Sequence, residues 1–154
     1  MKGAELETDI GHVLVFGLTA AFARDFDLSR VDLPAAEIFT AARDRGGFAV
    51  AAHAGRPRIG LWDHIERLSD FSHIEAIEQL NGGSSNEENE RAALLAERHG
   101  FHCIGGSDAH YVSAIGRCLT AFNRPIRSVE ALVEELRGGS YNPMRIEETF
   151  HGIE

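Results

Sequence analysis

The hydrophobic pattern along the chain alternates between short apolar runs and longer amphipathic segments. Residues 12–17 and 48–52 are nearly continuous runs rich in β-branched, aromatic or small apolar side chains, which predicts buried strands. Residues 101–104 and 118–122 predict two more strands, and residues 74–80 fit either a strand or a short helix. Because helical segments separate these runs, the pattern predicts an α/β fold with mostly parallel strands.

Three segments carry the start and stop signals of helices. Proline or serine stands at the start and glycine just past the end. These segments are residues 34–45, 84–99 and 128–137. The pattern also predicts a helix over residues 61–68, a loop over residues 25–32 and a short tail at the end of the chain.

Length and composition narrow the class of protein. The 154 residues fit one domain, residues 1–154, and an apolar content of 44% indicates a packed core. A net charge of -9 disfavours broad binding to nucleic acid, although a small phosphorylated substrate remains compatible if bound cations reverse the local field.

Cysteine usage and hydropathy bear on the compartment. Cys103 and Cys118 both lie in apolar runs, which favours two buried reduced thiols over a disulfide or zinc thiolates and fits the cytoplasm. The first residues do not resemble a signal peptide, and the longest apolar stretch, residues 13–23, is too short to span a bilayer. We therefore expect no membrane partner.

Potential metal ligands follow two of the predicted strands. His53 comes directly after residues 48–52, and Asp108 and His110 follow residues 101–104. Sites in parallel α/β folds form at the carboxyl ends of strands, and residues two apart in extended backbone point to the same side. Asp108 and His110 should therefore face one cavity. Each residue alone fits a structural role as well, but together they predict a site for zinc, manganese or iron(II).

The motif Gly-Gly-Ser-Asp-Ala-His at residues 105–110 resembles the last metal motif of the PHP (polymerase and histidinol phosphatase) superfamily. Other matching segments extend this resemblance over nearly the whole chain: residues 3–5, 12–17, 52–57, 78–82, 89–100, 115–116, 120–122 and 126–139. The resemblance implies a TIM-barrel-like, distorted (β/α)7 barrel of the PHP type that is incomplete, because the N-terminal HxH strand of the family has no counterpart in this sequence. Ala54 also stands where the family usually has proline.

The resemblance implies a role for each matching residue. Glu5 would bridge two metal ions, and Glu5 and Asp108 would be catalytic. His12 and His53 would bind one ion, Asp108 a second and His110 a third. From its place after His53, Arg56 could hold a substrate phosphate, and a surface role fits it equally well. Packing or solvated roles are favoured for the other histidines, which include His64, His73, His99 and His151.

The implied function is that of a divalent-metal-dependent phosphoesterase, with Zn, Mn or Fe as cofactor. It would hydrolyse a phosphate mono- or diester of a nucleotide or small metabolite through a metal-bound hydroxide. The alternative is a truncated or split PHP module that binds metal or a partner without catalysing, its open barrel covered by a complementing chain or by homo-oligomerisation. A coding start upstream of Met1 is a third interpretation.

Overall fold

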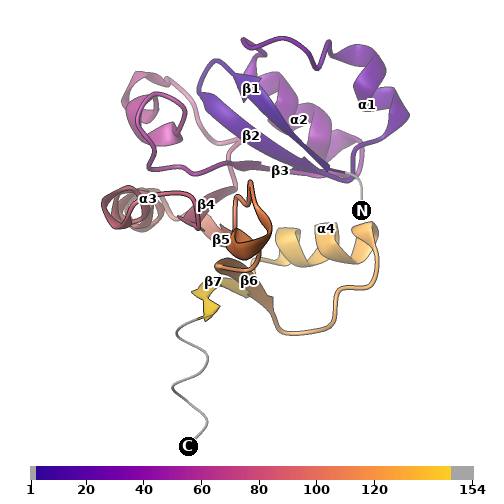
Figure 1. Cartoon of the computed structure of the whole chain (residues 1–154). Coiled ribbons are helices and arrows are strands. Elements are labelled where there is room, and N and C mark those ends of the chain that lie inside the picture. Colours follow the sequence, from indigo (N-terminus) through magenta and orange to yellow (C-terminus); the bar gives the residue numbers. More distant parts are fainter. Residues whose placement is uncertain (1–2, 147–154) are drawn as a thin grey trace, which may run out of the picture.

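The computed structural model describes residues 3–146 and contains a central mixed sheet with the strand order β1-β2-β3-β4-β5 (Figure 1). These strands are β1 (Gly3–Thr8), β2 (Gly11–Phe16), β3 (Phe48–Ala51), β4 (Ala76–Asn81) and β5 (His102–Gly106). The pairs β1–β2 and β2–β3 are antiparallel, whereas β3–β4 and β4–β5 are parallel. Only β2 therefore runs against the others, which confirms an α/β fold with mostly parallel strands.

The last two strands form a sheet of their own. β6 (Cys118–Phe122) and β7 (Tyr141–Arg145) pair in antiparallel fashion, and this two-stranded sheet lies beside β5 (Figure 1). The central sheet stays open, so the strands of residues 3–146 do not form a closed barrel.

Within residues 3–145, four α-helices accompany the sheets, and three of them begin where the sequence predicts. They are α1 (Ala20–Asp25), α2 (Ala35–Asp44), α3 (Asn86–His99) and α4 (Val129–Gly138). At the start of α3 the Ser85 hydroxyl accepts from the Glu88 N–H while the Glu88 carboxylate accepts from the Ser85 N–H, a complete capping box. Among the described residues no helix has the length and apolar character needed to cross a membrane.

Strand β3 is buried on both of its faces, which explains its unbroken apolar run. Phe48 and Val50 belong to the core cluster that contains Leu136 of α4. The alternate residues Ala49 and Ala51 belong to the larger cluster that contains residues of α1, α2 and α3. Successive side chains of a strand point to opposite faces, so one short strand contributes to two hydrophobic layers.

Three local predictions need correction or completion. Residues 61–68 form two 3₁₀ turns, Leu61–Asp63 and Ile65–Arg67, instead of one helix, because their backbone hydrogen bonds join residues three apart and the Trp62 N–H is bonded to the Ala54 carbonyl. The ambiguous segment 74–80 forms β4. Part of the expected tail is strand β7, and residues 147–154 lie outside the described part of the chain.

Candidate metal centre

Three of the predicted ligands meet at one place. Glu5 lies on β1 and His12 on β2, and the pairing of Glu7 with His12 makes Glu5 a diagonal neighbour of His12 across the hairpin. His53 follows β3 and reaches the same point from the other side of β2. The sequence separation of 48 residues between Glu5 and His53 is closed by the antiparallel order of β1, β2 and β3.

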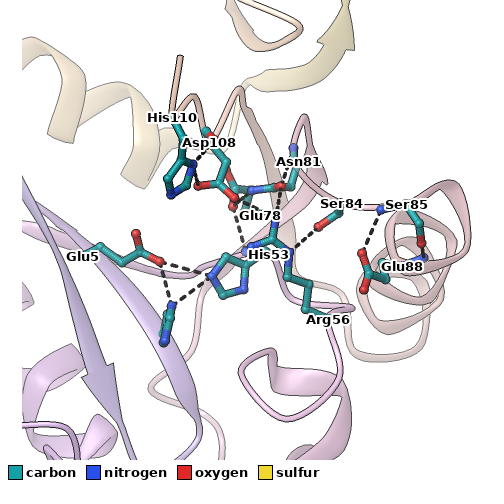
Figure 2. Close-up of polar contacts among 12 residues, drawn as sticks. Glu5, His53, Arg56, Glu78, Asn81, Ser84, Ser85, Glu88, Asp108 and His110 are labelled. Atoms are coloured by element: carbon teal, nitrogen blue, oxygen red, sulfur yellow. Dashed lines mark hydrogen bonds and ion pairs between the residues drawn. The ribbon is translucent and has the colours of Figure 1, made fainter. Parts of the chain in front are cut away.

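The three side chains place their ligand atoms in a nearly equilateral triangle. His12 Nδ1 lies 2.9 Å from Glu5 Oε1, and His53 Nε2 lies 3.1 Å from both Glu5 Oε1 and His12 Nδ1 (Figure 2). Ligand atoms around a tetrahedral zinc ion at about 2.0–2.1 Å stand roughly 3.3 Å apart. The triangle is therefore close to the spacing that one divalent ion requires.

The cluster is also accessible. The His53 side chain is 3% exposed, that of His12 23% and that of Glu5 42%, so the triangle is buried on the His53 side and open on the Glu5 side. Catalytic metal sites keep a position open for water or substrate, whereas structural sites are closed by four protein ligands. Three protein ligands with one exposed side fit the catalytic kind.

The ionised carboxylate of Glu5 favours cation binding at this cluster. The hydrogen bond from His53 lowers the pKa of Glu5 to about 2, helped by the bond from His12 and opposed by partial burial. Glu5 is therefore a carboxylate at neutral pH. Among the buried side-chain nitrogen and oxygen atoms of the described residues, His53 Nδ1 is the one without a hydrogen-bond partner.

His53 and Asp108 share an unusual backbone conformation. The φ angles are 30° for His53 and 47° for Asp108, in the left-handed region that non-glycine residues rarely adopt. Such residues cost roughly 1–3 kcal/mol each and are concentrated at functional sites. Both follow strands of the parallel part of the sheet, where the sequence predicts the site.

The structure does not bring Asp108 and His110 into the triangle. The expected extended conformation of residues 108–110 is wrong, because the backbone is left-handed at Asp108, with φ of 47°. The two side chains still lie close together, with His110 Nδ1 3.9 Å from Asp108 Oδ1. His110 is 82% exposed, and its Nδ1 lies 2.9 Å from the Asp108 carbonyl oxygen. Their roles as further metal ligands stay predictions.

Arg56 is held close to Asp108. Its Nη2 donates to Asp108 Oδ2 at 2.7 Å and to Asn81 Oδ1 at 3.1 Å, and its Nε donates to Ser84 Oγ at 2.9 Å (Figure 2). Arg56, Asp108 and His110 line a cavity of about 320 Å³. A larger cavity of about 800 Å³ lies between the 3₁₀ turns and α3 and has none of the candidate ligands in its lining.

Sequence reasoning assigned no role to the polar residues at the end of β4. Glu78 is only 4% exposed, and burial raises its pKa above the ordinary value although the hydrogen bond from Asn81 and the His53 N–H oppose this. Asn81 and Asn89 are buried beside it and bonded to each other. The signal that could have found them is a charged residue inside the apolar pattern of residues 74–80, since buried acids are rare without partners.

Fold and site together define a class: an α/β protein with a two-histidine, one-carboxylate cluster suited to a divalent cation beside an open mixed sheet. His64, His73, His99 and His102 lie outside this cluster, as the sequence predicts, and His151 lies outside the described residues.

Comparisons with known proteins agree with the family resemblance. A family model described as PHP-associated matches residues 86–141. The 3',5'-nucleoside bisphosphate phosphatase of Chromobacterium violaceum is 41% identical over 75 residues, which is 47% of this chain and 26% of the phosphatase. These matches agree with the PHP resemblance: the chain is similar to a PHP-associated family over residues 86–141 and to a bisphosphate phosphatase over 75 residues.

A solved structure has the same fold. The crystal structure of PsfC from Pseudomonas syringae PB-5123 superposes with a TM-score of 0.71 at 21% identity, covering 96% of this chain and 59% of PsfC. The fold is therefore shared over nearly the whole chain, while the chain spans only part of the length of either relative.

Proposed function

We propose that this protein is a divalent-metal-dependent phosphoesterase that hydrolyses a phosphate mono- or diester. The observation that carries the proposal is the triangle of Glu5, His12 and His53, whose three ligand atoms lie about 3 Å from one another at an accessible edge. The similarity to a nucleoside bisphosphate phosphatase supports a phosphorylated nucleoside or a related small metabolite as substrate.

The residues of this chain divide the work as follows. Glu5, His12 and His53 would hold a Zn, Mn or Fe ion, and Glu5 brings the negative charge that offsets part of the charge of the ion. When bound, such an ion lowers the pKa of a coordinated water from its ordinary value toward about 7 and neutralises phosphate oxygens. The open Glu5 side of the triangle leaves room for the substrate.

Arg56 and Asp108 would act at the neighbouring cavity. The guanidinium of Arg56 is oriented by Ser84 and Asn81, so it is suited to attract a phosphate dianion into that cavity. Asp108 neutralises Arg56 in this structure. We propose that Asp108 and His110 bind further metal ions, and that the open sheet is one arc of a PHP-type barrel.

The test combines metal analysis with hydrolysis of two generic esters, p-nitrophenyl phosphate and bis(p-nitrophenyl) phosphate. We expect wild-type protein to bind zinc or manganese and to hydrolyse at least one ester, and we expect Glu5→Gln and His53→Ala to lose both properties. His64→Ala serves as the matched histidine control, because its ring contacts only the Arg58 carbonyl among the hydrogen bonds of the described residues.

The outcomes separate the two candidate functions. Metal binding without hydrolysis of either ester would favour the non-catalytic PHP module. Hydrolysis that survives Glu5→Gln, His53→Ala and exhaustive chelation would refute the proposal outright.

A further inference from the structure

The backbone turn that aims His53 is held by one residue of the neighbouring strand. The His53 N–H donates to Glu78 Oε2 at 2.7 Å, and the Ala54 N–H donates to the Glu78 carbonyl oxygen at 3.1 Å. Two consecutive peptide N–H groups at a left-handed residue are therefore bonded to Glu78. Because this conformation is unfavourable by itself, the surrounding bonds must maintain it.

The same oxygen of Glu78 sets the orientation of Asn81. Asn81 Nδ2 donates to Glu78 Oε2 at 2.9 Å, so the other amide atom, Oδ1, faces away from Glu78. There it accepts from the Gly83 N–H at 2.9 Å and from Arg56 Nη2 at 3.1 Å. A reversed amide would face donors with its NH₂ group at the Gly83 and Arg56 end and an acceptor with its oxygen at the Glu78 end, so only one orientation satisfies all of these groups.

Arg56 extends this chain of hydrogen bonds to Asp108. Its Nη2 is shared between Asn81 Oδ1 and Asp108 Oδ2, the latter at 2.7 Å. Figure 2 shows the continuous path from His53 through Glu78, Asn81 and Arg56 to Asp108. Two predicted metal ligands from strands β3 and β5 are thus joined through the end of β4.

Stability alone is a poor explanation for a carboxyl group at this position. Glu78 and Asn81 are almost completely buried, and burying a carboxyl group costs free energy that an apolar side chain would not cost. Gly106 on the adjacent strand also leaves the space that the Glu78 carboxylate occupies, since a Cβ there would overlap Oε1. The strand pair is shaped around this acid.

We propose that Glu78 and Asn81 are positioning residues of the metal centre. Glu78 holds the His53 turn so that Nε2 faces Glu5 and His12, and Asn81 holds Arg56 so that Asp108 stays at the cavity. The role rests on the proposed function, because it concerns the same site, and neither residue contacts the ion or the substrate.

Glu78→Met and Glu78→Gln test the positioning role of Glu78, with zinc affinity measured by titration calorimetry. Methionine removes both acceptors, and we expect metal affinity to fall about tenfold, the lower end for residues that support ligands. The single amide oxygen of glutamine can accept both bonds, so we expect Glu78→Gln to stay within about threefold of wild type, a rescue that a requirement for charge would not give.

Asn81→Ala tests the positioning role of Asn81 in the metal-free protein, through the ¹⁵N NMR signals of arginine side chains. We expect the Arg56 Nη2 signal of the wild type to shift or broaden in Asn81→Ala, because Nη2 is the atom that donates to Asn81 Oδ1. Asn89→Ala is the control, because Asn89 is also buried and its side chain bonds the backbone of Asn81 instead of Arg56 or Glu78. It should cost similar stability and retain both the Arg56 signal and the zinc affinity.

The role of Glu78 has two possible refutations. One is a folded Glu78→Met with the zinc affinity of the wild type. The other is a loss of zinc affinity in Asn89→Ala as large as that in Glu78→Met. An unchanged Arg56 signal in Asn81→Ala would overturn the role of Asn81. If wild type binds no zinc, the proposed function fails instead, and the His53 ring signals of the metal-free protein then decide, since they should shift in Glu78→Met and not in Asn89→Ala. If Glu78→Met does not fold, Asn81→Ala is used instead, because it removes one of the two hydrogen bonds to Glu78 Oε2. A zinc affinity of Asn81→Ala equal to that of Asn89→Ala would then refute the positioning role of Glu78.

Discussion

A divalent cation held by Glu5, His12 and His53 should raise the thermal stability of this protein, and His53→Ala should abolish that effect. The three ligand atoms come together only in the folded chain, because they lie on β1, on β2 and after β3. An ion that binds the native state and not the unfolded chain stabilises the native state by mass action.

The size of the effect follows from the occupancy of the site. At a free metal concentration 100 times the dissociation constant, the stabilisation is about 2.7 kcal/mol. For a domain of this length, 1 kcal/mol shifts the melting temperature by about 2–4 °C, so the wild type should gain roughly 5–10 °C. Losing one of three ligands should weaken binding at least about 100-fold, which leaves a stabilisation of about 0.4 kcal/mol and a shift near 1 °C.

The assay is a thermal melt followed by circular dichroism, with each variant measured once in chelator and once with zinc or manganese. The shift within each variant is compared, because His53 is buried and its removal also lowers stability directly. His64→Ala should shift as the wild type does. A shift in His53→Ala equal to that of the wild type, or no shift in the wild type at saturating metal, would refute the assembled ligand set.

Three further predictions concern the fold that supports the site, each measured by urea unfolding. Ser85→Ala should cost about 0.5–2 kcal/mol because it removes the cap of α3, and no change would refute the capping box. Burial raises the pKa of Tyr141 above its unfolded value of 10.0. The stability linked to its neutral hydroxyl is therefore complete below pH 10.0 and lost as the pH rises further. Tyr141→Phe should flatten this alkaline decline, and parallel curves of stability against pH for the variant and the wild type would contradict it. Gly55→Ala should cost about 1–3 kcal/mol or more, because the added methyl would overlap the backbone carbonyl of Glu88 in α3, and a neutral result would show that the loop can move.

The local elements that carry the site could be predicted from short stretches of sequence. The apolar run of β3 followed at once by His53, and the serine cap and glycine end of α3, are signals that a few neighbouring residues provide. The 3₁₀ turns at residues 61–67 could not be predicted in this way. The Trp62 N–H in these turns is hydrogen-bonded to the carbonyl of Ala54, which lies outside the segment whose pattern predicted a helix.

Glu5 illustrates what pattern and resemblance each contribute. As a residue near the start of the chain it has the pattern of a solvated acid, and 42% of its side chain is indeed exposed. Its likeness to the GxE segment of the PHP superfamily singled it out, and the β1–β2 register supplies the physical reason, since a diagonal neighbour of His12 can reach the same cation. Resemblance identified the residue, and strand pairing explains it.

The surroundings of Asp108 depend on a different kind of information. A charged residue that is mostly buried needs a partner of opposite charge, and this requirement is readable from residue type. Which partner it finds is decided by the fold. Arg56 reaches Asp108 across 52 positions, and Asn81 and Ser84 bond the same guanidinium. Arg56, a candidate for substrate binding, and Asp108, a predicted metal ligand, are therefore bonded to each other. Any metal ion that binds the Asp108 carboxylate must displace the Arg56 guanidinium or share the carboxylate with it.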